Sequence, residues 1–313
     1  MHTKSLTTPY NAGLHRFTVF VACSIFVLLI AGALVTSNSA GLSVPDWPTS
    51  FGSIYKIPPL VNGVQFEHVH RMIAQFVGFL TIILAVWTQR VDRRPWMRAL
   101  GWAALGTVIA QGILGGITVL FGLPPAVSTA HATLAQMFFC IVVGMALFTG
   151  RSWVEQEPRT VVHSEHPSLV ALAYLSVAVV WIQLILGAAF RHNGMKWLPH
   201  IVGAVIVTCV LGWMIGRVLA RYNELPPLRT PALILLGLLF IQLSLGVSAF
   251  VTRVMWGKDA AQPMMSMVVT TVAHVAVGAL VLATTVVLAI QARRHVTVSN
   301  EGTVSQTQKA VIA

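Results

Sequence analysis

The sequence predicts an all-α integral membrane protein with eight transmembrane helices, arranged as two pseudo-symmetric four-helix bundles. Three observations support this fold class: the composition is 56% hydrophobic and 9% charged, the apolar residues fall into blocks, and a histidine–glycine pattern repeats along the chain. Soluble domains contain about a quarter charged residues, so this chain has too few polar residues to enclose a soluble core. Each block is close to or longer than the roughly 20 residues that a helix needs to cross a bilayer. The predicted spans are Phe17–Thr36, Val69–Trp87, Ala99–Phe121, Thr129–Phe148, Leu169–Phe190, Leu198–Ile215, Ala232–Val251 and Met265–Ala289.

The spans divide the chain into five predicted segments. They are a cytoplasmic N-terminus (1–16), an N-terminal bundle (17–150), a cytoplasmic linker (151–167), a C-terminal bundle (168–292) and a polar tail (293–313) that we expect to be mobile. The first block follows a short basic stretch, as a secretory signal does. It is too long for one, and seven further spans follow it.

The net charge of +11 indicates orientation rather than nucleic-acid binding. The termini and the even-numbered loops hold fourteen of the twenty Lys and Arg, and the odd-numbered loops with their flanks hold six. Basic residues concentrate on the cytoplasmic side of membrane proteins. We therefore expect a multi-pass protein of the cell inner (cytoplasmic) membrane, with both termini cytoplasmic and no nucleic-acid partner.

Each even-numbered span carries one histidine near its predicted external end, and a small residue follows four positions later on the same helical face. The histidines are His70, His131, His200 and His274, and the small residues are Ala74, Ala135, Ala204 and Gly278. Spans 3, 5 and 7 share a Gln-x-x-Leu-Gly pattern, ending at Gly115, Gly187 and Gly246, whereas span 1 keeps only Gly32. The repeated unit is a hairpin of a glycine helix and a histidine helix, which suggests duplicated halves.

Four histidines at matched depth predict two haem sites, because four-helix bundles commonly hold a haem between two histidines. We pair His70 with His131 and His200 with His274. A lone intramembrane histidine is more often a packing or relay residue. A bare metal ion is a weaker alternative, because no carboxylate or thiolate completes a tetrahedral set.

The two halves differ at Glu67, which lies one helical turn before His70. A carboxylate beside a haem edge suggests chemistry, so Glu67 is the candidate catalytic residue; an ion pair with Arg71 at i+4 is the structural alternative. His68 points away from His70 and is expected to be a bystander. Arg71, and less strongly Arg191, are candidate contacts for haem propionates, because guanidinium matches carboxylate geometry.

These residues resemble the haem A synthase family over roughly residues 15–292. The marks are Glu67-x-x-His70-Arg71, the run from Gly41 to Pro48 with Pro-Asp-Trp-Pro at its end, Gly115-Gly116 leading to Ser128-Thr-Ala-His131, and Ala273-His274-Val-Ala-Val-Gly278. Many bacterial members have a cysteine where this chain has Val44. The loop from 38 to 63 contains no cysteine, and the three cysteines of the chain lie within predicted spans.

The resemblance implies a membrane oxidoreductase that converts haem O to haem A by oxidising a ring methyl to a formyl group. Haem O would be the substrate in the N-terminal half, with iron ligands His70 and His131, and haem b the cofactor in the C-terminal half, with ligands His200 and His274. The formyl oxygen would come from water or from successive hydroxylations, a choice that the sequence leaves open. No flavin or nicotinamide fingerprint is present, so an external electron donor is expected. A haem O synthase and oxidase assembly factors are natural partners beside membrane lipid, and a homo-oligomer is an open option.

Two other classes of function remain open. One is a two-haem b-type electron-transfer protein that makes no haem product, and the other is a haem-binding assembly or transport protein without turnover. Glu67 favours the enzyme, because pure electron transfer has no need of an acid beside only one haem.

Overall fold

The computed structural model describes residues 9–53, 56–163, 165–257 and 263–298. Within them, eight helices are long and apolar enough to cross a membrane, which confirms the predicted fold class. The elements in chain order are α1 Ala12–Ser37, α2 Val64–Val91, α3 Pro95–Leu120, α4 Pro125–Thr149, α5 Arg151–Glu155, β1 Val161–His163, α6 Leu169–Arg191, α7 Leu198–Arg221, α8 Pro226–Phe250, the π-helical segment η1 Val251–Trp256, α9 Met265–His295 and β2 Val296–Val298.

Most helices extend beyond the apolar blocks that predicted them. Hydropathy marks the part of a helix that lies in hydrocarbon, whereas local backbone signals decide where the helix begins. Asn11 caps α1 by accepting the Leu14 N–H at 2.9 Å, and Ser168 caps α6 by accepting the Ala171 N–H at 3.1 Å. Proline occupies the first turn of α3, α4, α7 and α8, where its missing N–H costs no hydrogen bond.

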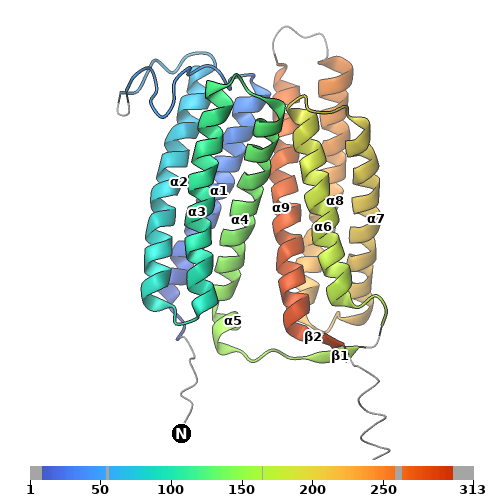
Figure 1. Ribbon diagram of the computed structural model, residues 1–313. Helices are drawn as coiled ribbons and strands as arrows, with labels where there is room; N and C mark the ends of the chain where they lie inside the picture. The colour runs from blue at the N-terminus through green and yellow to red at the C-terminus, as the bar shows by residue number, and fades with distance from the viewer. Residues whose placement is uncertain (1–8, 54–55, 164, 258–262, 299–313) are drawn as a thin grey trace, which may run out of the picture.

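The helices form two groups that stand side by side, α1–α4 in one and α6–α9 in the other (Figure 1). Each group encloses its own buried apolar cluster. The groups meet where α9 packs against α1 and α4, and where α4 packs against α6. Ala279 and Ala283 of α9 are buried in the cluster of the first group, so one small-residue face of α9 joins the two halves.

The linker and the end of α9 are more ordered than the sequence suggested. β1 pairs in parallel with β2, with Val161 opposite Val296. Arg294 donates to the carbonyl oxygens of Trp153 and Gln156 at 3.1 and 2.6 Å. Residues 293–298, at the start of the predicted polar tail, thus belong to α9 and β2. Residues 299–313 lie outside the described residues. Strand pairing between segments so far apart leaves no local sequence signal.

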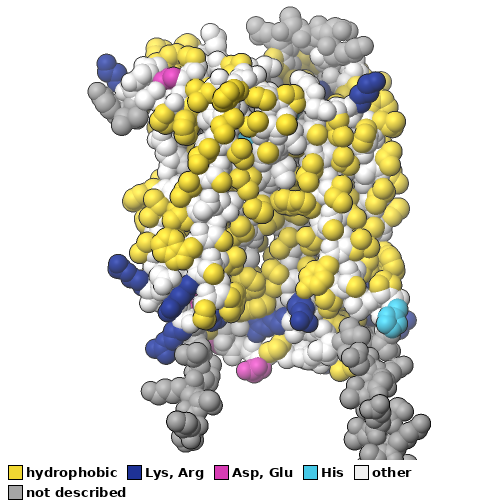
Figure 2. Space-filling model, viewed as in Figure 1, with side chains coloured by type: hydrophobic (Ala, Val, Ile, Leu, Met, Phe, Trp, Pro, Cys, Tyr) yellow, Lys and Arg dark blue, Asp and Glu magenta, His cyan; other side chains and the backbone are white. Residues whose placement is uncertain are grey.

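Side-chain chemistry follows the expected membrane arrangement on the face shown in Figure 2. Hydrophobic side chains cover the middle of this face. Across the described residues many large hydrophobic side chains are exposed, such as Phe79 at 60% and Phe240 at 73%. Lys and Arg gather at the end of the molecule toward which both described chain ends point (Figures 1 and 2). This gathering agrees with the charge bias from which we predicted the orientation, which stays a prediction.

Candidate functional site

Each of the four histidine rings lies against a glycine of the preceding long helix. The pairs are Gly32 with His70, Gly115 with His131, Gly187 with His200 and Gly246 with His274. A Cβ atom built on the glycine would lie 2.8 Å from the histidine Cε1 atom in the Gly187 pair and 3.1 Å from it in the other three pairs. These are tighter contacts than side chains normally make, so the absence of a side chain at each glycine makes room for the ring. The repeated glycine thus has a physical role that the sequence pattern alone did not reveal: it seats the imidazole.

A glutamine one turn before the glycine fixes three of the four histidine helices. The amides of Gln111 and Gln183 donate to the backbone carbonyls of His131 and His200 at 2.9 and 2.8 Å. Gln183 also lies 3.0 Å from Nδ1 of His200, and Gln242 lies 3.4 Å from Nε2 of His274. In α1 this position is Leu28, so the seat of His70 lacks the amide.

The second predicted histidine pair lies close together. The ring centres of His200 and His274 are 6.2 Å apart. The bond from a metal ion to an imidazole nitrogen is about 2 Å long at zinc. Two histidines that bind one ion through bonds of this length can have ring centres about 6 Å apart. The second pair therefore fits a bis-histidine haem iron. Whether these histidines are ligands stays a prediction.

Buried ring nitrogens without a partner also suit a ligand site. Nδ1 of His70, His131 and His274 is buried and has no hydrogen-bond partner of good geometry among the described residues. Buried polar atoms normally have partners. No group of three or more His, Cys, Asp or Glu side chains in the described part of the chain has the arrangement of a bare-metal site. A haem binds its iron through the nitrogens of its own ring, so the protein needs to supply only two histidines.

Glu67 is buried, 3% exposed, and forms the ion pair that was the structural alternative to a catalytic role. Its Oε1 lies 2.6 Å from Nη2 of Arg71. Its Oε2 accepts the backbone N–H of Val44 at 2.8 Å. Both carboxylate oxygens therefore have donors, one on the same helix and one on the α1–α2 loop (residues 38–63).

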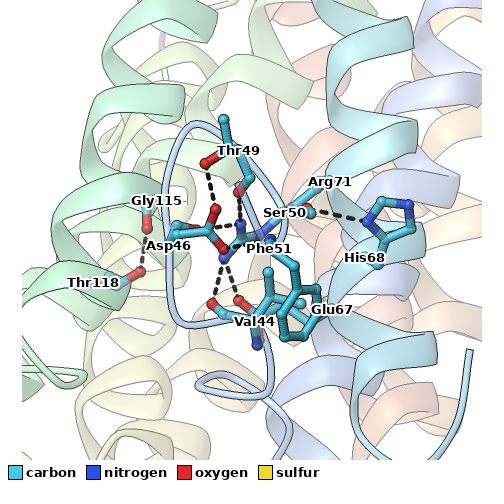
Figure 3. Close-up of polar contacts among 10 residues, drawn as sticks. All are labelled: Val44, Asp46, Thr49, Ser50, Phe51, Glu67, His68, Arg71, Gly115 and Thr118. Atoms are coloured by element: carbon cyan, nitrogen blue, oxygen red, sulfur yellow. Dashed lines mark hydrogen bonds and ion pairs between the residues drawn. The ribbon is translucent and has the colours of Figure 1, made fainter. Parts of the chain in front are cut away.

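Arg71 fastens the same loop (Figure 3). Its Nη1 donates to the carbonyl oxygens of Asp46 and Thr49 at 2.6 and 2.8 Å, and its Nη2 donates to the carbonyl oxygen of Val44 at 2.9 Å. His68, expected to be a bystander, is also buried, and its Nδ1 lies 3.1 Å from the Ser50 hydroxyl. The first two turns of α2 therefore hold the loop through three side chains.

Asp46 organises the loop from within. Burial opposes ionisation of its carboxylate. Hydrogen bonds from the Thr49 hydroxyl and from the backbone N–H groups of Gly52 and Phe51 nevertheless lower its pKa from 3.8 to about 2. The neighbouring Trp47 ring lies so close to Gly116 of α3 that a Cβ there would be 2.5 Å from the indole. The Pro-Asp-Trp-Pro run thus places an aromatic ring against Gly116, the residue that follows the glycine on which His131 is seated.

Arg191 connects the two halves. From the end of α6, its Nη2 donates to the Ala33 carbonyl and to the Ser37 hydroxyl of α1, both at 2.8 Å. Ser37 in turn lies 2.9 Å from the Thr271 hydroxyl of α9. Among the described residues Arg191 has no carboxylate partner, and Arg253 of η1 donates to its carbonyl oxygen at 3.1 Å. Sequence analysis did not single out Arg253 as a site residue.

Fold and site define a multi-pass membrane protein with two histidine pairs in two similar four-helix groups. A sequence model of a family described as "Cytochrome oxidase assembly protein" matches residues 61–197. The chain is 24% identical to the heme A synthase of Alkalihalophilus pseudofirmus over 263 residues, 76% of this chain and 87% of the relative. It is 29% identical to that of Shouchella clausii over 190 residues, 58% of this chain and 60% of the relative.

A third relative, the heme A synthase of Symbiobacterium thermophilum, is 30% identical over 177 residues, 54% of this chain and 56% of that protein. The chain thus spans somewhat less than two thirds of two of these three relatives. The chain is thus similar in sequence to several proteins that are named heme A synthase. This finding confirms the resemblance that the motifs predicted.

Proposed function

We propose that the protein is a haem A synthase, which oxidises a ring methyl of haem O to a formyl group and so makes haem A for terminal oxidases. The observation that carries the proposal is the fourfold seat of histidine on glycine, which occurs twice in each half. It supports one haem in each half, with His70 and His131 holding the substrate haem O and His200 and His274 holding haem b. The relatives named heme A synthase support the same reaction.

The haem irons, when bound, supply the redox chemistry, and the chain positions them. Glycine seats orient all four imidazoles, and glutamine amides add to this at His131, His200 and His274. A ring held by packing and hydrogen bonds keeps its orientation. In the substrate half, the α1–α2 loop brings Trp47 against α3 and so helps to exclude water. Exclusion of water strengthens electrostatic interactions within a site.

We propose Glu67 as the catalytic carboxylate of the substrate half, acting as a base or as a stabiliser of positive charge. Arg71 and the Val44 N–H both donate to its carboxylate group. A carboxyl group one turn from His70 suits either role. The same contacts also make Glu67 a fastening point of the loop, so its two roles need an experiment that separates them.

The arrangement supports Arg191 more than Arg71 as the contact for a haem propionate. Both terminal nitrogens of Arg71 already donate to loop carbonyls and to Glu67. Within the described part of the chain, the side chain of Arg191 donates to neutral acceptors alone. A buried or partly buried cation is costly without an anion, and a propionate would supply one.

We further propose that electrons come from an external donor, because the chain carries no flavin or nicotinamide fingerprint. A haem O synthase would supply the substrate, and oxidase assembly factors would take up the product. We place the protein in the cell inner membrane with both termini cytoplasmic.

The proposal is tested by extracting haems from a host that makes haem O, with and without this gene. We expect haem A only when the gene is expressed. The absence of haem A, in cells where the protein is present and contains haem b, would refute the activity.

The ion pair of Glu67 favours a second candidate, a two-haem b-type electron-transfer protein. Glu67 is the main difference between the halves. If it serves only to hold the loop, this difference is no longer an argument for catalysis. This candidate predicts two haem b groups per chain and no change in the haem types of the host. The same extraction therefore distinguishes it from the synthase.

A further inference from the structure

A cavity of about 650 Å3 lies between the two halves, at the end of the molecule that carries the linker and β2. Its size falls within the usual range for small-molecule sites, about 300–1,000 Å3. Four elements form its walls, and seven of its nine lining residues are apolar or aromatic. The lining residues are Phe148, Trp153, Tyr174, Val177, Val286, Ala289, Ile290, Arg293 and Arg294.

The cavity exists because the halves are joined elsewhere. At the opposite end of the helices, Arg191 reaches Ala33 and Ser37 bonds Thr271. Midway along, Ala279 and Ala283 of α9 pack into the first half. Beyond these small residues, α4 supplies Phe148 and α6 supplies Tyr174, which is 54% exposed, so the cavity opens toward the surface that faces lipid.

The polar end of the cavity is basic. Arg294 is already engaged: it donates to two carbonyl oxygens of the linker, its guanidinium lies 4.1 Å from the centre of the Trp153 ring, and Glu157 is its acidic neighbour. Arg293 is exposed and has no carboxylate partner among the described residues. It lies in the last turn of α9, at the level where lipid headgroups would meet the protein.

We propose that this cavity binds one anionic phospholipid, with an acyl chain against the apolar walls and the phosphate beside Arg293. Basic pockets between transmembrane helices bind anionic headgroups in this way. The chemistry of the walls and of the mouth requires an apolar body with an anionic head. A neutral quinone brings no anion to Arg293, and a zwitterionic lipid brings a cation beside its phosphate, so both suit this basic mouth less well. The site is independent of the histidines and goes beyond the proposed haem chemistry.

The test uses the full chain reconstituted in bilayer discs. The discs contain about four phosphatidylcholine molecules for each phosphatidylglycerol. After release into detergent, native mass spectrometry counts the lipid that remains bound. We expect one retained phosphatidylglycerol in preference to phosphatidylcholine. Arg293→Gln should reduce its retention by about fivefold, the typical contribution of one basic residue near an anionic surface. Arg90→Gln, at another exposed arginine outside the cavity and at the end of α2, should leave it unchanged.

A second measurement covers the case in which a variant folds poorly. Phosphatidylglycerol brominated on its acyl chains should quench the fluorescence of the parent protein more than that of Trp153→Phe, because Trp153 lines the cavity. Equal retention of the two lipids overturns the proposal, as does an equal loss in Arg90→Gln and Arg293→Gln. A quinone recovered at one per chain in place of phosphatidylglycerol overturns it as well.

Discussion

The two halves share one design for holding a histidine and differ in what surrounds it. In the C-terminal half, both histidines have a glycine seat and a glutamine amide, from Gln183 and Gln242. In the N-terminal half, Leu28 replaces one glutamine, and a loop fastened by Glu67 and Arg71 lies beside the site. A rigid, symmetric site suits a resident cofactor. A site with a looser seat beside a separate loop suits a substrate that enters and a product that leaves.

The largest expected effect tests the assignment of haem b to the C-terminal half. His200→Ala and His274→Ala should abolish the low-spin haem b spectrum of the purified protein, because each removes one of the two proposed iron ligands. His70→Ala and His131→Ala should retain it. Loss of haem b in His70→Ala, with His274 intact, would show that the histidines are paired across the halves.

The next effect tests whether the difference at Glu67 is catalytic. Glu67→Gln should give normal protein and haem b, because Arg71 keeps three carbonyl acceptors on the loop. Haem A formation should fall by at least about tenfold, or roughly 1.4 kcal/mol of transition-state stabilisation. Extracted haems should show haem O or its partly oxidised alcohol in place of haem A.

Two variants separate catalysis from fastening of the loop. Glu155→Gln breaks an exposed i,i+4 pair with Arg151 and should change nothing. Arg71→Lys weakens the hold on the loop while leaving the Glu67 side chain unchanged. An equal fall in haem A from Arg71→Lys and Glu67→Gln would assign Glu67 to the loop, and haem A at the parental rate in Glu67→Gln would remove it from the mechanism.

A smaller effect tests the glycine seat. Gly187→Ala places a Cβ at 2.8 Å from the His200 ring and should displace it. Overpacking costs about 1 kcal/mol or more, so haem b affinity should fall by about fivefold in a titration of the haem-free protein. Gly237→Ala, where a Cβ meets nothing within 4 Å, is the matched control. Equal affinity in the two variants contradicts a role for the seat.

The smallest expected effect concerns the junction between the halves. Thr271→Val keeps the shape of the side chain and removes its hydrogen bond to Ser37. Hydrogen bonds between membrane helices contribute about 0.6 kcal/mol on average, so the midpoint of thermal unfolding should fall only slightly and haem content should stay unchanged. A loss of haem from both halves would instead show that this contact couples the two sites.

The sequence by itself determined the eight spans, the depth of the histidines and the repeated hairpin. These features depend on properties that lie within one helix: apolar length sets a span, and positions four residues apart share a face. For the same reason the His–Gly pairing was visible as a repeat, although not as a contact. Helix ends were less certain, because caps and prolines outside the apolar blocks decide them, as Asn11 does for α1.

Only the tertiary structure decided what the charged residues do. The sequence left open whether Glu67 pairs with Arg71, and it contained no sign that Val44, 23 residues away, would donate to the same carboxylate. Nor did it indicate that Arg191 would reach Ala33 across 158 residues. A charge within a largely apolar protein takes whichever partner the fold brings near it, and that choice depends on contacts between segments that no local pattern records.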